Sequence, residues 1–359
     1  MDARGLHIVH AGADRVVFKR GVRELLVNGE HTDTLVSQVL PLLDGLSTQA
    51  EVVEAFPAPW RPAVESLLDA LVERGLVADG DAEADGGAGL GTLQDAFYAN
   101  FPAAEAVVGE LLRACDIVVV GLNLTSRVLV GALLDAGVGR IVLVPHAALD
   151  DGAPGLALEA SGWPALDGGP GERVELAPQD DLAAVVAAGT LTVAGSDHGE
   201  SEALLDVNRL ALAAGRPFLP FWIADLVGHV GPLVYPFETA CLRCYQLRVD
   251  SNDDKRDVSR EVRRAVAEAT DGSLSAGMLP PMASVVGGVV ALEVLKVLTQ
   301  FAPSDAVARA VEINLVAMSS AVRRVLKVPR CPDCSEIMDA AAVSVRAGPQ
   351  ATSAGTWVG

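Results

Sequence analysis

The stretch from Asp116 to Val144 constrains the fold more than any other part of the chain. It opens with DIVVVG, a continuously apolar run typical of a strand buried on both faces of a parallel sheet. SRVLVGALLDAG follows with the apolar spacing of a helix, and RIVLVP predicts a second buried strand. A strand, a helix and a strand in this order predict a βαβ unit, which indicates a protein of the α/β class.

The turn after the first strand bears on whether this βαβ unit binds a nucleotide. A phosphate-binding turn needs glycines where the backbone approaches the anion, and the second strand should end in an acidic residue that binds the ribose. The turn GLNLTSR keeps Gly121 but has Asn123, Leu124 and Ser126 where glycines are expected, and side chains at these positions would crowd a phosphate. The second strand ends in Pro145 and His146. We therefore expect no ATP site.

Strand and helix patterns continue to alternate after this unit. GTLTVAGSD predicts a strand, SEALLDVNRLALAAG a helix and RPFLPFWIADLVGHVGPLVYP a pair of strands. A polar helix is expected from Asp250 to about Ala269, then a long apolar helix and a hairpin that ends at CPDC. These patterns predict one α/β domain over residues 92–337.

Four of the five cysteines form two CxxC pairs, Cys241 with Cys244 and Cys331 with Cys334. Two such pairs supply the four thiolates of a tetrahedral Zn²⁺ site, which leaves no coordination position for water and is therefore structural. The alternatives are a redox pair or two disulfides, and we disfavour them because neither CxxC is expected at the start of a helix after a strand. Cys115 stands alone and is interpreted as a small buried residue.

The N-terminal residues 1–78 form a separate pattern. LHIVHAG, RVVFKRG and VRELLVNG predict a three-stranded meander, and three helices are expected at 31–45, 47–56 and 61–77, with Ser47 as a cap and Gly75 as a stop. This order predicts a winged helix-turn-helix. The acidic, glycine-rich residues 79–91 predict a flexible linker, and residues 338–359 a mobile tail.

Charge favours a peptide over DNA as the ligand of this N-terminal domain. Residues 1–78 carry seven Lys and Arg against eleven Asp and Glu, and the third helix offers only Arg61 and Arg74 as cations. A peptide can instead add to the edge strand and lie beside the third helix. The alternative is a dimerisation or packing appendage. The candidate peptide-binding residues are Arg20, Val22, Arg23, Leu25, Val27, Val64, Leu67, Leu68, Leu71 and Arg74.

Composition limits the class of protein and its location. Half of the 359 residues are hydrophobic and 4% are aromatic, as in a folded α/β protein, and the net charge of -20 opposes binding to nucleic acid. The N-terminus lacks the pattern of a signal peptide. The longest apolar run, Met282 to Leu298, is about one turn short of a bilayer span and contains Glu293 and Lys296, so it predicts a buried helix. We expect a cytoplasmic protein without a membrane partner.

Two resemblances add to these inferences. VVFKRGVRELLVNG, VLPLLDG and LLDALVERGLV resemble the recognition domain that binds the leader of ribosomally synthesised precursor peptides. Residues from Cys115 to Glu336 resemble the ThiF-type, ubiquitin-activating-enzyme-like family, through the βαβ unit, both cysteine pairs and ASVVGGVVALEVLK. The combination resembles the ThiF-like leader-binding partners of YcaO cyclodehydratases. It implies a winged-helix recognition domain followed by a Rossmann-type domain with a structural four-cysteine zinc site.

The resemblance implies a non-catalytic role. Such a partner binds the precursor leader and delivers the core peptide to the YcaO enzyme, which forms azolines in thiazole/oxazole-modified, thiopeptide-like products. Asp197 matches the position of the family's metal-binding aspartate, but the adjoining arginine segment is missing before Arg173. The alternatives are an active ATP-dependent adenylating enzyme and a zinc-bearing transcription factor. A homodimer is expected by analogy with the family.

Overall fold

The computed structural model describes residues 6–12, 14–77, 93–98, 100–101, 107–150, 173–268 and 277–335. The chain divides into two compact units, Met1–Val108 and Gly109–Gly359. The predicted linker and the predicted tail lie outside the described residues, as does the segment 151–172 that follows the βαβ unit.

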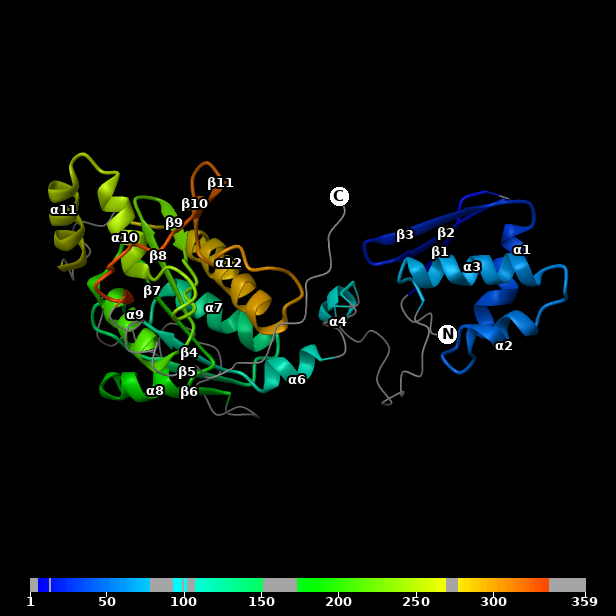
Figure 1. Ribbon diagram of the computed structural model, residues 1–359, viewed down its shortest axis with the longest axis horizontal. Helices are drawn as coiled ribbons and strands as arrows, with labels where there is room; N and C mark the ends of the chain where they lie inside the picture. The colour runs from blue at the N-terminus through cyan, green and yellow to red at the C-terminus, as the bar shows by residue number, and fades with distance from the viewer. Residues whose placement is uncertain are drawn as a thin grey trace. The chain divides into compact units, whose positions relative to one another are not determined.

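The first unit contains a three-stranded antiparallel sheet in the order β1-β2-β3 (Figure 1). Its strands are β1 (His7–His10), β2 (Arg15–Arg20) and β3 (Arg23–Asn28). Valine and phenylalanine side chains alternate toward the helices, and Val16 and Phe18 are almost completely buried. The strands follow the predicted meander, and β3 forms one edge of the sheet.

Helices cover this sheet in the predicted order. They are α1 (Thr32–Val39), the short 3-10 helix η1 (Leu40–Leu42), α2 (Gln49–Glu54) and α3 (Arg61–Glu73). The predicted cap of the second helix was wrong by one residue. Thr48, not Ser47, accepts the Glu51 N–H, and the Glu51 carboxylate accepts the Thr48 N–H in return.

A further short helix, α4 (Leu93–Tyr98), belongs to the first unit, whereas the sequence placed it at the start of the body. Its continuation reaches the turn between β2 and β3. The Asn100 side chain accepts the Val22 N–H at 3.1 Å, and its carbonyl accepts the Arg23 guanidinium at 2.8 Å. The shift in composition predicts where the linker lies, but it does not show which unit the residues after the linker join. The contacts of Asn100, which link residues distant in sequence, decide that they join the first unit.

The second unit is built on an eight-stranded sheet in the order β11-β10-β9-β8-β7-β4-β5-β6. The pairs from β6 to β8 are parallel, and the pairs from β8 to β11 are antiparallel. Its strands are β4 (Asp116–Val120), β5 (Arg140–Val144), β6 (Val174–Leu176), β7 (Leu191–Ser196), β8 (Phe218–Ala224), β9 (Val227–Val230), β10 (Arg309–Asn314) and β11 (Ser319–Arg324).

Helices lie on both faces of this sheet (Figure 1), as the parallel strands require. α7 (Leu124–Asp135) and α12 (Pro280–Thr299) pack together on one face, and α8 (Leu182–Ala188) and α9 (Glu202–Ala214) cover the other. The remaining helices are α6 (Val108–Arg113), η2 (Gln179–Asp181), α10 (Leu242–Ser251) and α11 (Arg256–Glu268).

α12 is the predicted long apolar helix, PPMASVVGGVVALEVLKVLTQ, and its observed end at Thr299 is one residue short of the predicted end. By length and composition alone it is suited to crossing a membrane, but half of its most apolar window is buried inside the unit. Glu293 is 3% exposed and accepts hydrogen bonds from Lys296, Ser304 and the Ala306 N–H. These contacts fix α12 to the loop before β10, as expected for a core helix.

Candidate functional sites

The four paired cysteines form one buried cluster. Sγ atoms lie 3.8 Å apart between Cys241 and Cys244, 3.7 Å between Cys241 and Cys331, and 3.6 Å between Cys244 and Cys334. Zn–S bonds of about 2.3 Å in a tetrahedron place the sulfurs about 3.8 Å from one another. The cluster therefore has the spacing of a four-thiolate metal site, and the sequence predicted its members.

Neighbouring groups hold this cluster in place. The Leu242 N–H at the start of α10 donates to the buried Asn208 side chain of α9 at 3.2 Å. The Val328 N–H donates to the Cys244 sulfur at 3.4 Å. One argument from the sequence was wrong, because Cys241 is the N-cap of α10 and so does begin a helix. The convergence of four sulfurs, rather than the position of one pair, supports a metal site over a redox pair.

The turn after β4 is tightly packed. Gly121 has a positive φ of 97°, and a Cβ there would lie 2.6 Å from the Gly195 carbonyl and 2.8 Å from the Leu149 side chain. Glycine at this position is thus required because the turn packs against the end of β7 and the loop after β5. Its retention does not by itself indicate a bound phosphate.

Side chains of the protein itself accept hydrogen bonds from the backbone amides at the start of α7. Asn123 is 2% exposed, and its carbonyl oxygen accepts the Ser126 N–H at 2.8 Å while its amide donates to the Gly195 and Leu149 carbonyls. Asp197, at the end of β7, accepts the Thr125 hydroxyl at 2.6 Å and the Thr125 N–H at 3.2 Å. Burial raises the pKa of Asp197, and the two hydrogen bonds from Thr125 oppose this shift.

Asp150 occupies the other side of the same turn. Its carboxylate accepts the Leu122 N–H at 2.6 Å and the His146 N–H at 3.0 Å. The second strand does not itself end in an acidic residue, as its sequence shows. Asp150, just beyond that strand, nevertheless folds back to the turn, and only the loop geometry reveals this contact.

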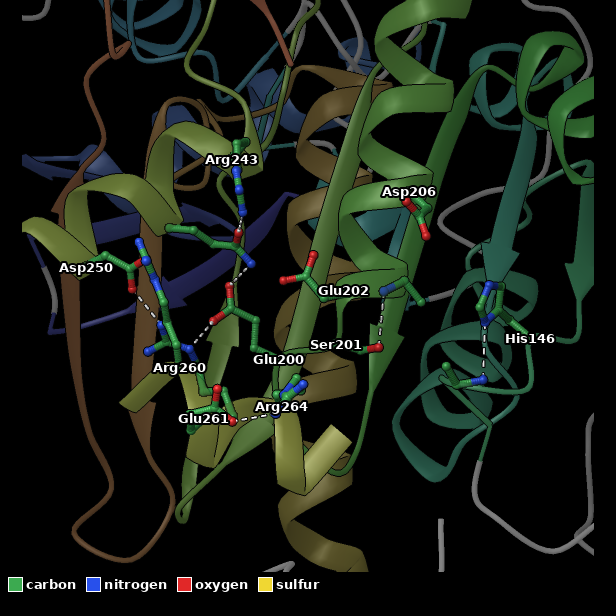
Figure 2. Close-up of a pocket in the computed structure, with 14 residues that line it drawn as sticks. His146, Glu200, Ser201, Glu202, Asp206, Arg243, Asp250, Arg260, Glu261 and Arg264 are labelled. Atoms are coloured by element: carbon green, nitrogen blue, oxygen red, sulfur yellow. Dashed lines mark hydrogen bonds and ion pairs between the residues drawn. The ribbon is translucent and has the colours of Figure 1, made fainter. Parts of the chain in front are cut away.

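A cavity of about 640 Å³ lies beside this strand-end turn (Figure 2). On one wall, α10 and α11 carry arginines that are held by acidic side chains. Arg260 and Arg263 both pair with Asp250, at 2.7 and 2.6 Å, and Arg263 lies 3.9 Å from Glu200. Burial raises the pKa of Glu200, and its hydrogen bond from Gln246 and the charge of Arg263 oppose this shift.

The opposite wall carries His146, with Glu202 and Asp206 between the walls (Figure 2). The His146 Nδ1 accepts the Ala148 N–H at 3.3 Å, and burial lowers the pKa of the imidazole. His146 is therefore neutral near pH 7. Carboxylates outnumber arginines in the cavity lining, and Arg260 and Arg263 are already paired with Asp250. This excess of negative charge disfavours the binding of a triphosphate.

Cys115 is buried, and its thiol donates to the Leu111 carbonyl at 2.9 Å. Burial raises the pKa of this thiol. A buried, protonated thiol is a poor nucleophile. These contacts agree with the interpretation of Cys115 as a small core residue.

The first unit separates the predicted peptide-binding residues into two groups. A shallow pocket at the junction of β3 and the end of α3 is lined by Val22, Arg23 and Arg74, together with Glu24 and Val72. Leu25 and Val27 are half-buried on β3. Arg20 lies at the end of β2 and does not line this pocket. Arg23 is already engaged, because its guanidinium donates to the Gly75 and Asn100 carbonyls at 3.0 and 2.8 Å.

The remaining group lies in the core. Val64, Leu67, Leu68 and Leu71 are between 0 and 5% exposed and pack against the sheet inside the unit. They are therefore not available to a peptide, which corrects their assignment as contact residues. Helical spacing predicted that these residues share one face, but spacing does not reveal whether the sheet of the same unit already covers that face.

Comparisons with known proteins agree with this architecture. Residues 173–336 match the ThiF family. The crystal structure of E. coli MccB with succinimide is similar at 14% identity, with a TM-score of 0.65 over 93% of this chain and 98% of MccB. The heterocyclase TruD is similar at 18% identity, with a TM-score of 0.59 over 93% of this chain and 42% of TruD.

A heterocyclase in complex with substrate and cofactor gives 19% identity and a TM-score of 0.57, over 93% of this chain and 39% of the heterocyclase. This chain thus spans about two fifths of the two heterocyclases. MccB structures include complexes with ATP and with AMPCPP and MccA. At these identities the similarity establishes the fold. No curated protein gave a significant match.

Proposed function

Because this chain contains a ThiF family domain over residues 173–336, we propose that it is a partner protein in the modification of a ribosomally synthesised peptide. It binds the leader of the precursor through its first unit, a winged-helix recognition domain over residues 1–78. It delivers the core peptide to a YcaO cyclodehydratase that forms azolines. Tethering the leader raises the effective concentration of the core at the enzyme.

The open edge of β3 is the observation that carries this proposal. Within the described residues, β3 pairs only with β2. The Gly29 N–H donates to the Asp14 carbonyl at 3.0 Å, and these residues lie opposite each other by continuation of the β2–β3 register. Hydrogen-bonded pairs alternate along an antiparallel ladder, so Glu24, Leu26 and Asn28 direct their N–H and C=O groups away from β2.

These outward groups match what an added peptide strand requires. The outward Val22 N–H at the end of the same edge is already bonded to Asn100, so the available edge runs from Glu24 to Asn28. The half-buried Leu25, Val27 and Val72 provide apolar contacts beside it. The excess of acidic residues in this unit disfavours duplex DNA.

Two substitutions at one position test the leader site. Leu26→Pro removes an outward N–H without removing a bond to β2, and Leu26→Ala keeps that N–H while removing the exposed side chain. The probe is the leader of a short Cys/Ser/Thr-rich precursor peptide, sought among the genes next to this one. In calorimetric titration of the full chain with that leader, we expect Leu26→Pro to weaken binding about tenfold. Leu26→Ala should weaken it less. Equal affinity of the native and proline forms would refute strand addition at β3.

We propose further that the chain is a pseudo-enzyme that does not use ATP. The support is the start of α7, where Asn123, Asp197 and Asp150 occupy amides that a phosphate would need. An active ThiF-type adenylating enzyme is the second candidate, favoured by the fold shared with MccB, which has been crystallised with ATP. Titration with ATP and Mg²⁺ distinguishes them. Micromolar affinity would support the adenylating enzyme, whereas no measurable heat is expected for the pseudo-enzyme.

The four-cysteine cluster fits a structural Zn²⁺ that joins the start of α10 to the segment after β11. We place the protein in the cytoplasm, where free thiolates persist to bind the metal. The partners we propose are the precursor peptide and the YcaO enzyme, with neither nucleic acid nor membrane. A second copy of this chain is also proposed, since Leu279, the N-cap of α12, and Leu292 within the helix are 63% and 52% exposed.

A further inference from the structure

A second cavity of about 430 Å³ lies between α11 and the ends of β7 and β8. It is termed the α11 cavity. Its walls include Trp222, Leu226, Tyr245, Val258 and Val262. A volume of this size is in the range of small-molecule sites, which are mostly apolar with a few polar groups. The proposed leader site lies in the other unit, so this cavity is independent of that proposal.

The helix that covers the cavity is held by ion pairs, and two of its valines remain exposed. Arg260 and Arg263 of α11 bind Asp250 of α10. Val258 and Val262, one turn apart, line the cavity and remain 63% and 56% exposed. Two valines on an ordered helix, directed into a cavity without being buried, are in position to contact an apolar ligand.

The turn between β8 and β9 directs the Leu226 side chain into the cavity, and its backbone conformation is strained. Asp225 and Leu226 both have positive φ, at 50° and 66°. A two-residue hairpin of this kind favours Asn-Gly, and a leucine there is strained by roughly 1–2 kcal/mol. Leu226 is 37% exposed and lines the cavity, so its side chain contributes to the cavity rather than to the core.

Charge determines the class of ligand. Four carboxylates line the α11 cavity against two permanent cations, Lys255 and Arg263, and Arg263 is already paired with Asp250. Asp197 accepts hydrogen bonds from the uncharged Thr125, and the Asp225 carboxylate has no hydrogen-bond partner within the described residues. Burial raises the pKa of Asp197 and of Glu200, so these two carboxyls are left out of the charge count. Asp225 and Asp253 still outnumber Lys255, because Asp250 neutralises Arg263, and the local charge is negative.

The aromatic wall suits a cation as well. Trp222 stacks on His229 at 4.8 Å with an interplanar angle of 9°, and Tyr245 lies 5.7 Å from the indole. Burial lowers the pKa of His229, so the imidazole adds no positive charge near pH 7. Aromatic faces beside carboxylates attract organic cations.

We propose that the α11 cavity binds an amphiphilic amine, a ligand with an apolar or aromatic body and one ammonium group. The body lies between the valines of α11 and Trp222. The ammonium group faces Asp225 at the mouth of the cavity. No covalent step is involved.

Phenethylamine is the probe, with 3-phenylpropionate as the control of reversed charge and propylamine as the control without an aromatic body. Binding to the full chain is measured by calorimetry and by tryptophan fluorescence. For a ligand this small, we expect a Kd of roughly 0.1–10 mM for phenethylamine. Each control should bind at least about tenfold more weakly, since it lacks either the charge or the buried body. Equal affinity for phenylpropionate, or no saturable binding of phenethylamine, would overturn the proposal.

Variants locate the site. Val262→Lys adds a bulky cation inside the cavity and should abolish phenethylamine binding, while Asp225→Asn should weaken it about two- to fivefold. Val322→Lys, at a comparably exposed valine on β11, is the matched control and should leave binding unchanged. All three positions are exposed, and circular dichroism checks that each variant is folded. Unchanged binding by Val262→Lys would place the ligand elsewhere and contradict the proposal.

Discussion

Single residues decide how the strand-end turn is used. From the sequence, Asn123 and Leu124 were expected to crowd a phosphate by their size. In the structure Asn123 points inward and caps α7, while Asp197 and Asp150 bind the neighbouring amides. The proposal that this turn binds no nucleotide therefore rests on amide donors that already have acceptors, and not on steric exclusion of a phosphate.

Glu200 provides a prediction at this scale. Burial raises the pKa of its carboxyl above the ordinary value. A raised folded-state pKa stabilises the fold below the unfolded pKa of about 4.3, and this contribution is lost as pH rises through the folded value. Glu200→Gln cannot ionise, so we expect it to lose less stability than the native protein as the pH rises above about 4.

Urea unfolding at several pH values measures this difference. The exposed neighbour Glu202 supplies the control, because Glu202→Gln should follow the native pH dependence closely. If the free energy of unfolding of Glu200→Gln declines with pH as steeply as that of the native protein, the buried carboxyl does not contribute as described.

Helices and strands show where periodicity is sufficient and where it is not. The apolar spacing of α3 predicted a helix with one apolar face, and the structure has that helix from Arg61 to Glu73. Spacing did not distinguish a face that binds a peptide from one that packs on its own sheet. The short elements α6, α8 and β6 had no clear signal, because segments this brief contain too few residues to establish a period.

The metal cluster is a prediction at the scale of elements, since it joins α10 to the segment after β11. Cys331→Ser should reduce the zinc content from about one ion per chain to near zero. It should also destabilise the second unit by several kcal/mol, because metal binding energy contributes to folding. Atomic emission and thermal unfolding measure the two effects. Cys115→Ser, a buried cysteine outside the cluster, should retain zinc, and retention by Cys331→Ser would exclude a four-thiolate site.

The whole molecule consists of two units with separate cores, and each core is expected to unfold separately. Leu68 is completely buried in the first unit, so Leu68→Ala should destabilise that unit by about 2–5 kcal/mol and leave the second unchanged. Hydrogen exchange with mass spectrometry reports on each unit independently. Leu26→Ala, at a residue that is 51% exposed, is the control, with an expected effect within about 0.5 kcal/mol. Equal loss of protection in both units would indicate a single cooperative core.

The sequence by itself determined the α/β class, the order of the main strands and helices, and the four cysteines that meet. These features follow from local periodicity and from residue chemistry, which a linear sequence carries directly. Only the tertiary structure decided which groups satisfy the amides of α7, which face of α3 is covered, and which valines of α11 remain over a cavity. Each depends on contacts between residues far apart in the chain, and spacing along the sequence contains no information on how loops bring such residues together.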